Sequence, residues 1–296
     1  MKKYLSALAA LALLFACTPE GATVVELTGI ALSEHDITFE VGDNKVLVVT
    51  FTPENATNKD VTWESSNPSI ATVTDGIVVA LAPGTTEVVA KSGNLTDKCT
   101  VTVKKPVPDG AVDLGLSVYW ATCNIGANAP HKYGDFYAWG ETETKKDYYW
   151  KSYIWCKGDY KTLTKYNYSS SYGTVDDKTV LDADDDVAHV KLGGNWRMPT
   201  DDEWTELREN CTWTFTAQNG NYGILLTSNK NGNSIFLPAG DKWGDGMNVD
   251  TFGYYWSSSL STEYPYRAPN MLITPDGVTR QDRGRQEGFS VRPVSE

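Results

Sequence analysis

The chain is poor in the residues that build metal and redox sites. Of its 296 residues only 3 are histidine and 5 are cysteine. His35, His131 and His189 lie far apart, and no two cysteines have the C-x-x-C spacing of zinc and thiol–disulfide sites. The H-E-x-x-H and G-x-S-x-G motifs of hydrolases are missing too. We therefore predict no metal ligand, no cofactor and no catalytic residue, and expect a protein that is not an enzyme.

Positive charge is also scarce. The 26 Lys and Arg residues are outnumbered by 38 Asp and Glu, which gives a formal net charge of −12. An acidic surface repels phosphate backbones, so nucleic acid is not expected as a partner. Helix-forming Leu and Met are sparse, whereas aromatic residues make up 11% of the chain. This composition favours β-strands and loops.

Long hydrophobic runs are missing as well, because the apolar run Leu5–Ala16 is too short to span a bilayer. It follows Lys2 and Lys3 and predicts a signal peptide over residues 1–16. Its end, Leu14 to Cys17, resembles a lipobox, where bacteria cleave before Cys and acylate the thiol. We predict lipidation of Cys17, a tether over residues 17–23 and a surface-exposed outer membrane lipoprotein of the cell envelope. An ordinary secretory signal is the alternative.

Residues 24–105 have the pattern of short strands separated by turns. Val46–Phe51, Ile77–Ala80 and Thr86–Ala90 are rich in β-branched residues, and turn formers such as Asp75-Gly76 lie between them. Regular spacing of this kind predicts an antiparallel β-sandwich.

Three motifs in this stretch, Val61–Pro68, Ile70–Val73 and Ala82–Thr86, resemble a bacterial immunoglobulin-like domain of group 2. The resemblance implies a seven-strand sandwich with the Trp63 side chain in its core. Such domains act as spacers or as adhesin modules, and we expect a spacer here.

A proline-containing link over residues 106–110 leads to a second domain over residues 111–296. Two helices are expected in it. Asp184–Lys191 has Val187 and Val190 on one stripe. The other begins at Thr200, which with Glu203 has the capping-box spacing, and turns Trp204 and Leu207 inward.

Arg197–Trp204 resembles a segment of formylglycine-generating-enzyme-like and other C-type-lectin-fold domains. Further motifs of a related group of exported bacterial proteins are Trp120-Ala121, Tyr137–Gly140, Gly194–Thr200, Ile235–Ala239, Tyr255–Ser259 and Gly288–Val294. The fold class is therefore predicted as mainly β with a small α+β part, an immunoglobulin-like β-sandwich followed by a C-type-lectin-like domain. Most motif residues are expected to be structural, with core positions for Trp120, Trp196, Trp204 and Trp256. Formylglycine-generating enzymes use reactive cysteines late in the chain, and none follows Cys211 here, so the resemblance carries no catalytic activity.

The segment Tyr254–Val294 is similar in its frame to the variable segment of retroelement-diversified receptors, where the frame surrounds a binding face. Tyr and Arg are residues that recur in binding hot spots. The predicted ligand-binding residues are Tyr264, Tyr266, Arg267, Asn270, Thr274, Arg280, Asp282 and Arg283. A plain terminal β-hairpin with a solvated tip is the alternative, and diversification stays open.

The sequence contains other candidate sites that its pattern does not favour. The acids Asp176, Asp177, Asp182, Asp184, Asp185 and Asp186 could hold calcium, but they lack the pattern of an EF-hand and fit a solvated helix start. The sugar-binding triplet of calcium-dependent lectins is absent, since Ala268 precedes Pro269-Asn270. Glu141 and Glu143 could form a glycosidase pair, a reading that we do not favour. Export permits disulfides, and their pairing among Cys99, Cys123, Cys156 and Cys211 stays open.

The sequence thus predicts a cell-envelope lipoprotein that binds a protein or carbohydrate ligand at the cell surface through its C-terminal domain, as an adhesin or as a diversified receptor. The membrane is contacted through the lipid at Cys17. The alternative is a structural component of a surface assembly, whose terminal hairpin packs against a neighbouring copy without a soluble ligand.

Overall fold

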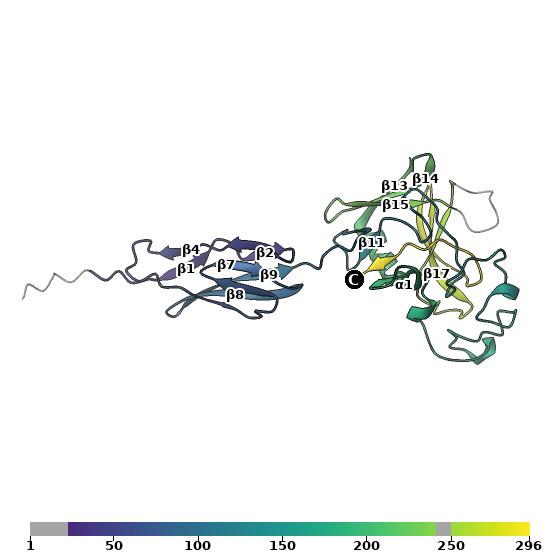
Figure 1. The fold of residues 1–296 in the computed structure, drawn as a ribbon, viewed down its shortest axis with the longest axis horizontal. Helices are drawn as coiled ribbons and strands as arrows, with labels where there is room; N and C mark the ends of the chain where they lie inside the picture. The colour runs from purple at the N-terminus through teal and green to yellow at the C-terminus, as the bar shows by residue number, and fades with distance from the viewer. Residues whose placement is uncertain (1–22, 241–249) are drawn as a thin grey trace, which may run out of the picture. The chain divides into compact units, whose positions relative to one another are not determined.

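The computed structural model describes residues 23–240 and 250–296, so Cys17 and its signal peptide lie outside the described residues. The chain divides into two units between Pro106 and Val107, inside the predicted link (Figure 1). Of the described residues, 39% are in strands and 9% in helices, which confirms the mainly β fold class. Across the described ranges no helix has the length and apolarity needed to cross a membrane.

The N-terminal unit is built from strands that form a β-sandwich around a single core. One sheet has the order β2-β9-β8-β5, a second β3-β7-β6, and β1 pairs with β4. The two-residue turn Asp75-Gly76 joins β6 to β7 with positive φ at both residues, as a tight hairpin turn requires. The strands are β1 Gly29–Leu32, β2 Asp36–Phe39, β3 Asn44–Val46, β4 Val49–Thr52, β5 Thr62–Ser65, β6 Ala71–Thr74, β7 Ile77–Ala80, β8 Gly84–Ser92 and β9 Leu95–Val103.

Three expectations about this unit were wrong in detail. The run Val46–Phe51 is not one strand, because Leu47 turns into the core and its amide donates to the Gly76 carbonyl at 2.8 Å. The break divides the run between β3 and β4, and the described part of the unit has more strands than the seven implied. Trp63 packs against the core but is only partly buried.

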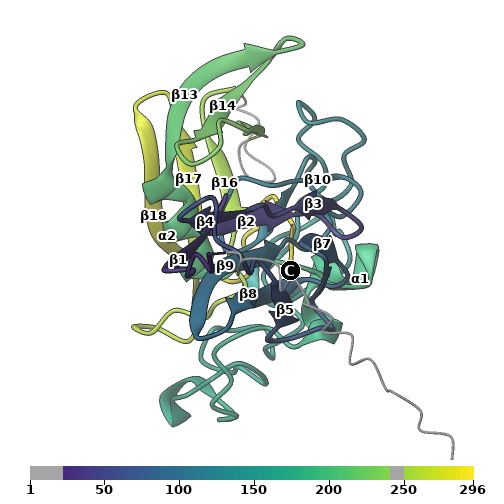
Figure 2. The same cartoon turned by 90° about the vertical axis from the view of Figure 1, so that its left-hand side faces the viewer.

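The C-terminal unit combines short sheets, two α-helices and long loops. The last strand, β19, pairs with β11 and β12, so the end of the chain closes onto the start of the unit. The hairpin β13–β14 lies beside β17–β18 (Figure 2). The elements are β10 Ala111–Val112, β11 Tyr119–Ala121, the 3₁₀ turns η1 Trp150–Ser152, η2 Ser170–Tyr172 and η3 Ala183–Asp185, α1 Val187–Leu192, β12 Trp196–Arg197, α2 Asp201–Asn210, β13 Cys211–Gln218, β14 Asn221–Ser228, β15 Ser234–Pro238, β16 Gly253–Trp256, β17 Arg267–Thr274, β18 Gly277–Gly284 and β19 Val294–Ser295.

Aromatic side chains fill the interior of this unit. Trp120, Trp204 and Trp256 are fully buried, as predicted, whereas Trp196 is only partly buried. The ring centroids of Trp120 and Trp204 lie 4.8 Å apart, within the range of favourable aromatic pairs.

The predicted capping box of α2 is confirmed. Thr200 Oγ1 accepts from the Glu203 amide at 3.2 Å, and Glu203 Oε2 accepts from the Thr200 amide at 2.8 Å. Arg197 donates to both carboxylate oxygens of Glu203, at 2.8 and 2.6 Å. Burial raises the pKa of Glu203, but these hydrogen bonds outweigh burial and hold the pKa below its usual range.

The helix α1 is shorter than predicted, because Asp186 is its N-cap rather than part of it. One Asp186 oxygen accepts from the amides of Ala188 and His189, and the other accepts from the Met198 amide at 2.7 Å. Asp186 is only 4% exposed, so the expectation of a solvated helix start was wrong. Val190 is exposed, and Ala188 takes the inward position instead.

Arg292 is a fully buried cation whose partners are all neutral. It donates to the side-chain oxygen of Asn124 and to the carbonyls of Ala121, Thr122 and Phe236, at 2.8 to 2.9 Å. Burial lowers its pKa. These bonds join the C-terminal segment to two other parts of the unit.

Replacing Arg292 with Met should destabilise the C-terminal unit by more than about 3 kcal/mol, because each buried acceptor left without a donor costs about 1–3 kcal/mol. Urea unfolding of the full chain, followed by Trp fluorescence, measures this, since nine of the 10 Trp residues follow Val107. The Arg208→Met change, at a partly exposed arginine of α2, is the control and should shift stability by less than about 0.5 kcal/mol. Equal destabilisation by Arg292→Met and Arg208→Met would contradict the structural role of Arg292.

The carboxylate of Glu203 should make stability depend on pH. Its pKa is lower in the folded chain, so its contribution is complete above the unfolded value of about 4.3 and is lost as pH falls through the folded pKa. We expect Glu203→Gln to lose about 1–3 kcal/mol at pH 7. The difference from the parent should shrink in urea titrations below pH 4. A difference that is constant with pH would rule this contribution out.

Candidate functional site

The hairpin β17–β18 carries most of the predicted ligand-binding residues, but it spreads them out. Arg267 pairs with Gly284 at one end and Thr274 with Gly277 at the other. Eight residues of strand separate these ends by about 23 Å. The predicted residues therefore form several neighbourhoods rather than one site.

Arg280 and Asp282 belong to an ion-pair network with α2. Arg280 Nε lies 3.0 Å from Asp201 Oδ2, and its Nη1 lies 3.1 Å from Asp282 Oδ1. Burial lowers the pKa of Arg280, but the two carboxylates outweigh burial and raise it. The network connects the hairpin to the helix start, which is a structural role.

Arg283 and Thr274 also have partners within the hairpin region. The Arg283 guanidinium lies 5.6 Å from the Tyr254 ring centroid, and its Nε donates to Gln281 at 3.1 Å. Thr274 Oγ1 donates to the Gly277 carbonyl at 3.2 Å and so stabilises the turn.

The prediction that Asn270 contacts a ligand does not fit the structure. Its side chain is 1% exposed, and its Nδ2 donates to the Gln281 carbonyl at 3.2 Å. Successive side chains of a strand point to opposite faces, and Pro269, Asn270 and Met271 are all buried. Both faces of β17 are therefore covered here, and Asn270 lies in the interior. A ligand at the surface cannot reach it.

Tyr264, Tyr266 and Arg267 are brought together with aromatic residues from a distant loop. The Tyr266 ring centroid lies 4.9 Å from Tyr160, 5.3 Å from Tyr172, 5.4 Å from Tyr264 and 6.4 Å from Trp150. We call these five rings the aromatic cluster. Each is partly exposed.

Arg267 completes the cluster on one side. Its guanidinium carbon lies 5.1 Å from the Tyr264 centroid and 5.5 Å from the Tyr266 centroid, which are cation–π distances. Rigid aromatic rings beside a cation offer a large contact area at low entropic cost, the chemistry of binding hot spots.

The sequence did not point to Trp150, Tyr160 and Tyr172. They lie in the loop 141–176, drawn in teal in Figure 1 with η1 and η2, where no strand or helix period marks the exposed side chains. The available signal was composition, because residues 148–172 contain nine aromatic residues.

Arg285 holds this loop against the segment that bears Tyr266. It is fully buried, with Nε donating to the Tyr153 hydroxyl at 2.8 Å. Its Nη atoms donate to the carbonyls of Tyr166, Pro265 and Lys165 at 2.8 to 3.0 Å. The guanidinium also lies 4.9 Å from the Trp139 ring centroid. One side chain thus fixes both halves of the aromatic cluster.

Two further contacts shape the loop. Glu141, 5% exposed, pairs with Lys145 at 2.7 Å and accepts from the Ile154 amide at 3.0 Å. Gly173 has φ +127° and approaches Leu163 so closely that an added Cβ would lie 2.1 Å from its carbonyl oxygen. Only glycine fits at this crossing of the loop.

A depression of about 750 Å³ adjoins the aromatic cluster through Trp150. Its walls are Asp147, Tyr149, Trp150, Lys151, Ser152, Gly158 and Gln286. This volume is within the range of small-ligand sites, and the wall combines rings with a few polar groups.

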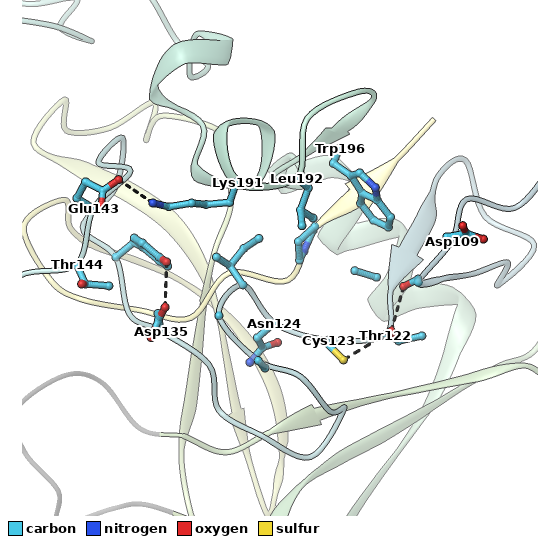
Figure 3. A pocket seen from close by; sticks show the side chains of 17 residues that line it. Asp109, Thr122, Cys123, Asn124, Asp135, Glu143, Thr144, Lys191, Leu192 and Trp196 are labelled. Carbon is cyan, nitrogen blue, oxygen red and sulfur yellow. Dashed lines mark hydrogen bonds and ion pairs between the residues drawn. The ribbon is translucent and has the colours of Figure 1, made fainter.

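A second pocket, of about 550 Å³, is lined by Asp109, Cys123, Asp135, Glu143 and Trp196 among others (Figure 3). Lys191 reaches across it to Glu143, with Nζ and Oε1 2.7 Å apart. The Tyr137 hydroxyl donates to Asp135 at 3.3 Å. This pocket contains none of the predicted ligand-binding residues.

Several of the acids that the sequence offered as calcium ligands have structural partners. Asp176 accepts from the Tyr166 and Asn167 amides, and Asp182 and Asp185 pair with Lys165 at 2.6 and 2.5 Å. Over residues 23–240 and 250–296 no group of acids, His and Cys is arranged to hold a metal ion. Cys99, Cys123, Cys156 and Cys211 are free thiols, and burial raises the pKa of Cys99 and Cys211 to about 11.

Comparison with known proteins identifies part of the chain. The Ig-like virion protein of Serratia phage KSP90 is 46% identical over 86 residues, which are 28% of this chain and 33% of that protein. An alpha-L-arabinofuranosidase of Bifidobacterium longum subsp. longum is 31% identical over 108 residues, 36% of this chain and 10% of that protein. The chain therefore spans a third or less of the length of these relatives.

Among solved structures, the S-layer protein SbsC, domains 5–6, aligns over 87% of this chain and 96% of its own, at 14% identity and a TM-score of 0.25. A score this low carries no argument about fold or function. Residues 26–103 match the bacterial Ig-like domain (group 2) family. The N-terminal unit is therefore a bacterial Ig-like domain of group 2, as its motifs suggested.

Proposed function

We propose that this chain is a cell-envelope lipoprotein that binds a protein or glycan ligand, without catalysis, through a C-type-lectin-like C-terminal unit. The observation that carries the proposal is the aromatic cluster. It gathers five partly exposed rings and Arg267 from two distant segments, next to an open depression. Partly exposed aromatic groups of this density are typical of interaction sites.

The binding surface that we propose is narrower than the sequence suggested. Tyr264, Tyr266 and Arg267 stay in it, and Trp150, Tyr160 and Tyr172 join it. Thr274, Arg280, Asp282 and Arg283 have intramolecular partners. They support the hairpin under this proposal.

The proposed absence of catalysis is supported by the ion pairs of Glu141 and Glu143. Glu141 is buried against Lys145, and Glu143 pairs with Lys191. Each carboxylate already has a cationic partner, and the two lie in different surroundings. A glycosidase pair needs both carboxyl groups to flank one substrate bond.

The Ig-like unit is proposed as a spacer between the lipid anchor and the binding unit. Its relative in a virion supports a place outside the cytoplasm. We propose an outer membrane, surface-exposed location on the same grounds and on the lipobox-like sequence before Cys17.

Replacing Tyr266 with Ala should weaken ligand binding at least about tenfold, the cost of a hot-spot residue, because its ring contacts the other members of the cluster. The full chain is applied to printed arrays of polysaccharides and of extracellular proteins, and bound ligands are titrated. Tyr222→Ala, at an exposed tyrosine of β14, is the matched control and should bind normally.

Unchanged binding by Tyr266→Ala would contradict the proposal. So would concentration-dependent self-association of the full chain without ligand in sedimentation velocity, which is the outcome expected of a structural surface-assembly component.

Replacing Cys17 with Ser should abolish incorporation of an alkyne fatty acid in growing cells and release the protein from the membrane fraction, because no acyl chains would remain to anchor it. Cys123→Ser, at a free thiol of the C-terminal unit, is the control and should keep its label. Labelling that survives Cys17→Ser would exclude the lipoprotein.

A further inference from the structure

The loop beside the aromatic cluster has a charge opposite to that of the chain. Residues 145–165 contain six Lys and two Asp, a net charge of +4. Since the whole chain has −12, the remaining residues together have −16. Positive charge is thus concentrated in the part of the chain that supplies Trp150 and Tyr160.

Several of these lysines have no acidic partner. Lys145 pairs with Glu141, and Lys165 pairs with Asp182 and Asp185. In contrast, Lys151, Lys157 and Lys161 are exposed and form no ion pair within the described parts of the chain. Arg267 lies over tyrosine rings and likewise has no carboxylate partner there.

Lys151, Lys161 and Arg267 lie at the aromatic cluster or the depression, and Lys157 precedes Gly158 of the depression wall. Lys151 lines the depression together with Trp150, and Lys161 Nζ lies 5.7 Å from the Tyr160 ring centroid. Asp159, which lies between Lys151 and Lys161 in the sequence, accepts from the Lys161 amide at 2.8 Å. The Tyr264 hydroxyl donates to the carboxylate of Glu263, which raises the pKa of that hydroxyl. Asp147 also lines the depression. Four free cations thus face three acids, two of which have other hydrogen-bond partners.

The wall of the depression offers polar groups of the kind that bind hydroxyls. Ser152 and Gln286 lie in it beside Trp150. Gln286 Oε1 is buried and accepts no hydrogen bond from the described residues. A buried acceptor without a donor costs about 1–3 kcal/mol. The terminal torsion of Gln is soft, so a small rotation would turn this oxygen toward a ligand hydroxyl.

We propose that the aromatic cluster and the depression bind an acidic polysaccharide, a glycan with carboxylate or sulfate groups along its chain. This rests on the proposed function and specifies its ligand. The apolar face of a sugar ring packs on Trp150 and Tyr266, its hydroxyls meet Ser152 and Gln286, and its anionic groups meet Lys151, Lys157, Lys161 and Arg267.

An acidic protein segment fits these observations less well. Protein interfaces are enriched in Arg and depleted in Lys, and three of the four free cations here are Lys. A lysine ammonium is a compact, hydrated charge on a flexible stem. It suits anionic groups that recur along a solvated polymer better than a single buried carboxylate.

The test compares polymers that share a backbone and differ in charge: polygalacturonate against its methyl ester, and dextran sulfate against dextran. Binding to the full chain is measured by calorimetry at several salt concentrations. In at least one pair the acidic form should bind at least about tenfold more tightly, with an affinity that falls as salt rises. Lys151→Ala, Lys157→Ala and Lys161→Ala should each weaken binding about two- to fivefold, the range for one exposed charge pair.

Lys230→Ala is the control, because this exposed lysine lies on another part of the same unit, 4.0 Å from Glu206. It should leave the affinity unchanged. Polyglutamate and duplex DNA should bind at least about tenfold more weakly than the acidic polysaccharide.

Other outcomes separate this inference from the proposed function. Equal binding of charged and neutral forms, with loss of both in Tyr266→Ala, would overturn the acidic ligand and retain recognition by the cluster. If neither acidic polymer binds, while binding of an array ligand still depends on Tyr266, the acidic ligand is likewise overturned and recognition by the cluster is retained. Equally tight binding of polyglutamate would indicate a protein partner, and equally tight binding of DNA would indicate charge alone; either overturns the inference.

Discussion

The C-terminal unit depends on the burial of Arg285. A guanidinium enclosed without a carboxylate must satisfy its donors with neutral acceptors, and here it does so with the Tyr153 hydroxyl and three carbonyls. Those acceptors belong to the loop 141–176 and to the segment before β17. Because a buried cation with missing acceptors is costly, the two segments are held in one arrangement. Arg292 does the same for β11, β15 and the segment that leads into β19.

This constraint explains how a loop without regular structure can present a defined surface. The aromatic cluster combines residues more than a hundred positions apart, and its rings contact each other only if both segments stay in place. The Glu141–Lys145 pair and the close crossing at Gly173 fix the loop internally. The loop can then expose lysines and aromatic rings, which under the proposed function are available for recognition.

Features that depend on local sequence were predictable. The capping box of α2, the Asp75-Gly76 turn, the Ig-like motifs and the burial of Trp120, Trp204 and Trp256 each follow from a few adjacent residues. Features that depend on distant contacts were not. Asn270 is buried because both faces of β17 are covered. Trp150, Tyr160 and Tyr172 contact Tyr266 because their loop folds against the segment before β17, and Arg285 bonds to both segments. Of the eight residues predicted to bind a ligand, only Tyr264, Tyr266 and Arg267 belong to the aromatic cluster or contact it.

The central claim is that Arg285 positions the aromatic cluster, and amide hydrogen exchange of the full chain tests it most directly. Arg285→Lys keeps the charge but cannot reach all four acceptors. We predict faster exchange in residues 149–173 and 264–267, with no change in α2 or in the Ig-like unit, because those elements have their own cores. Unchanged exchange in both segments, or a uniform increase over the whole C-terminal unit, would contradict the account.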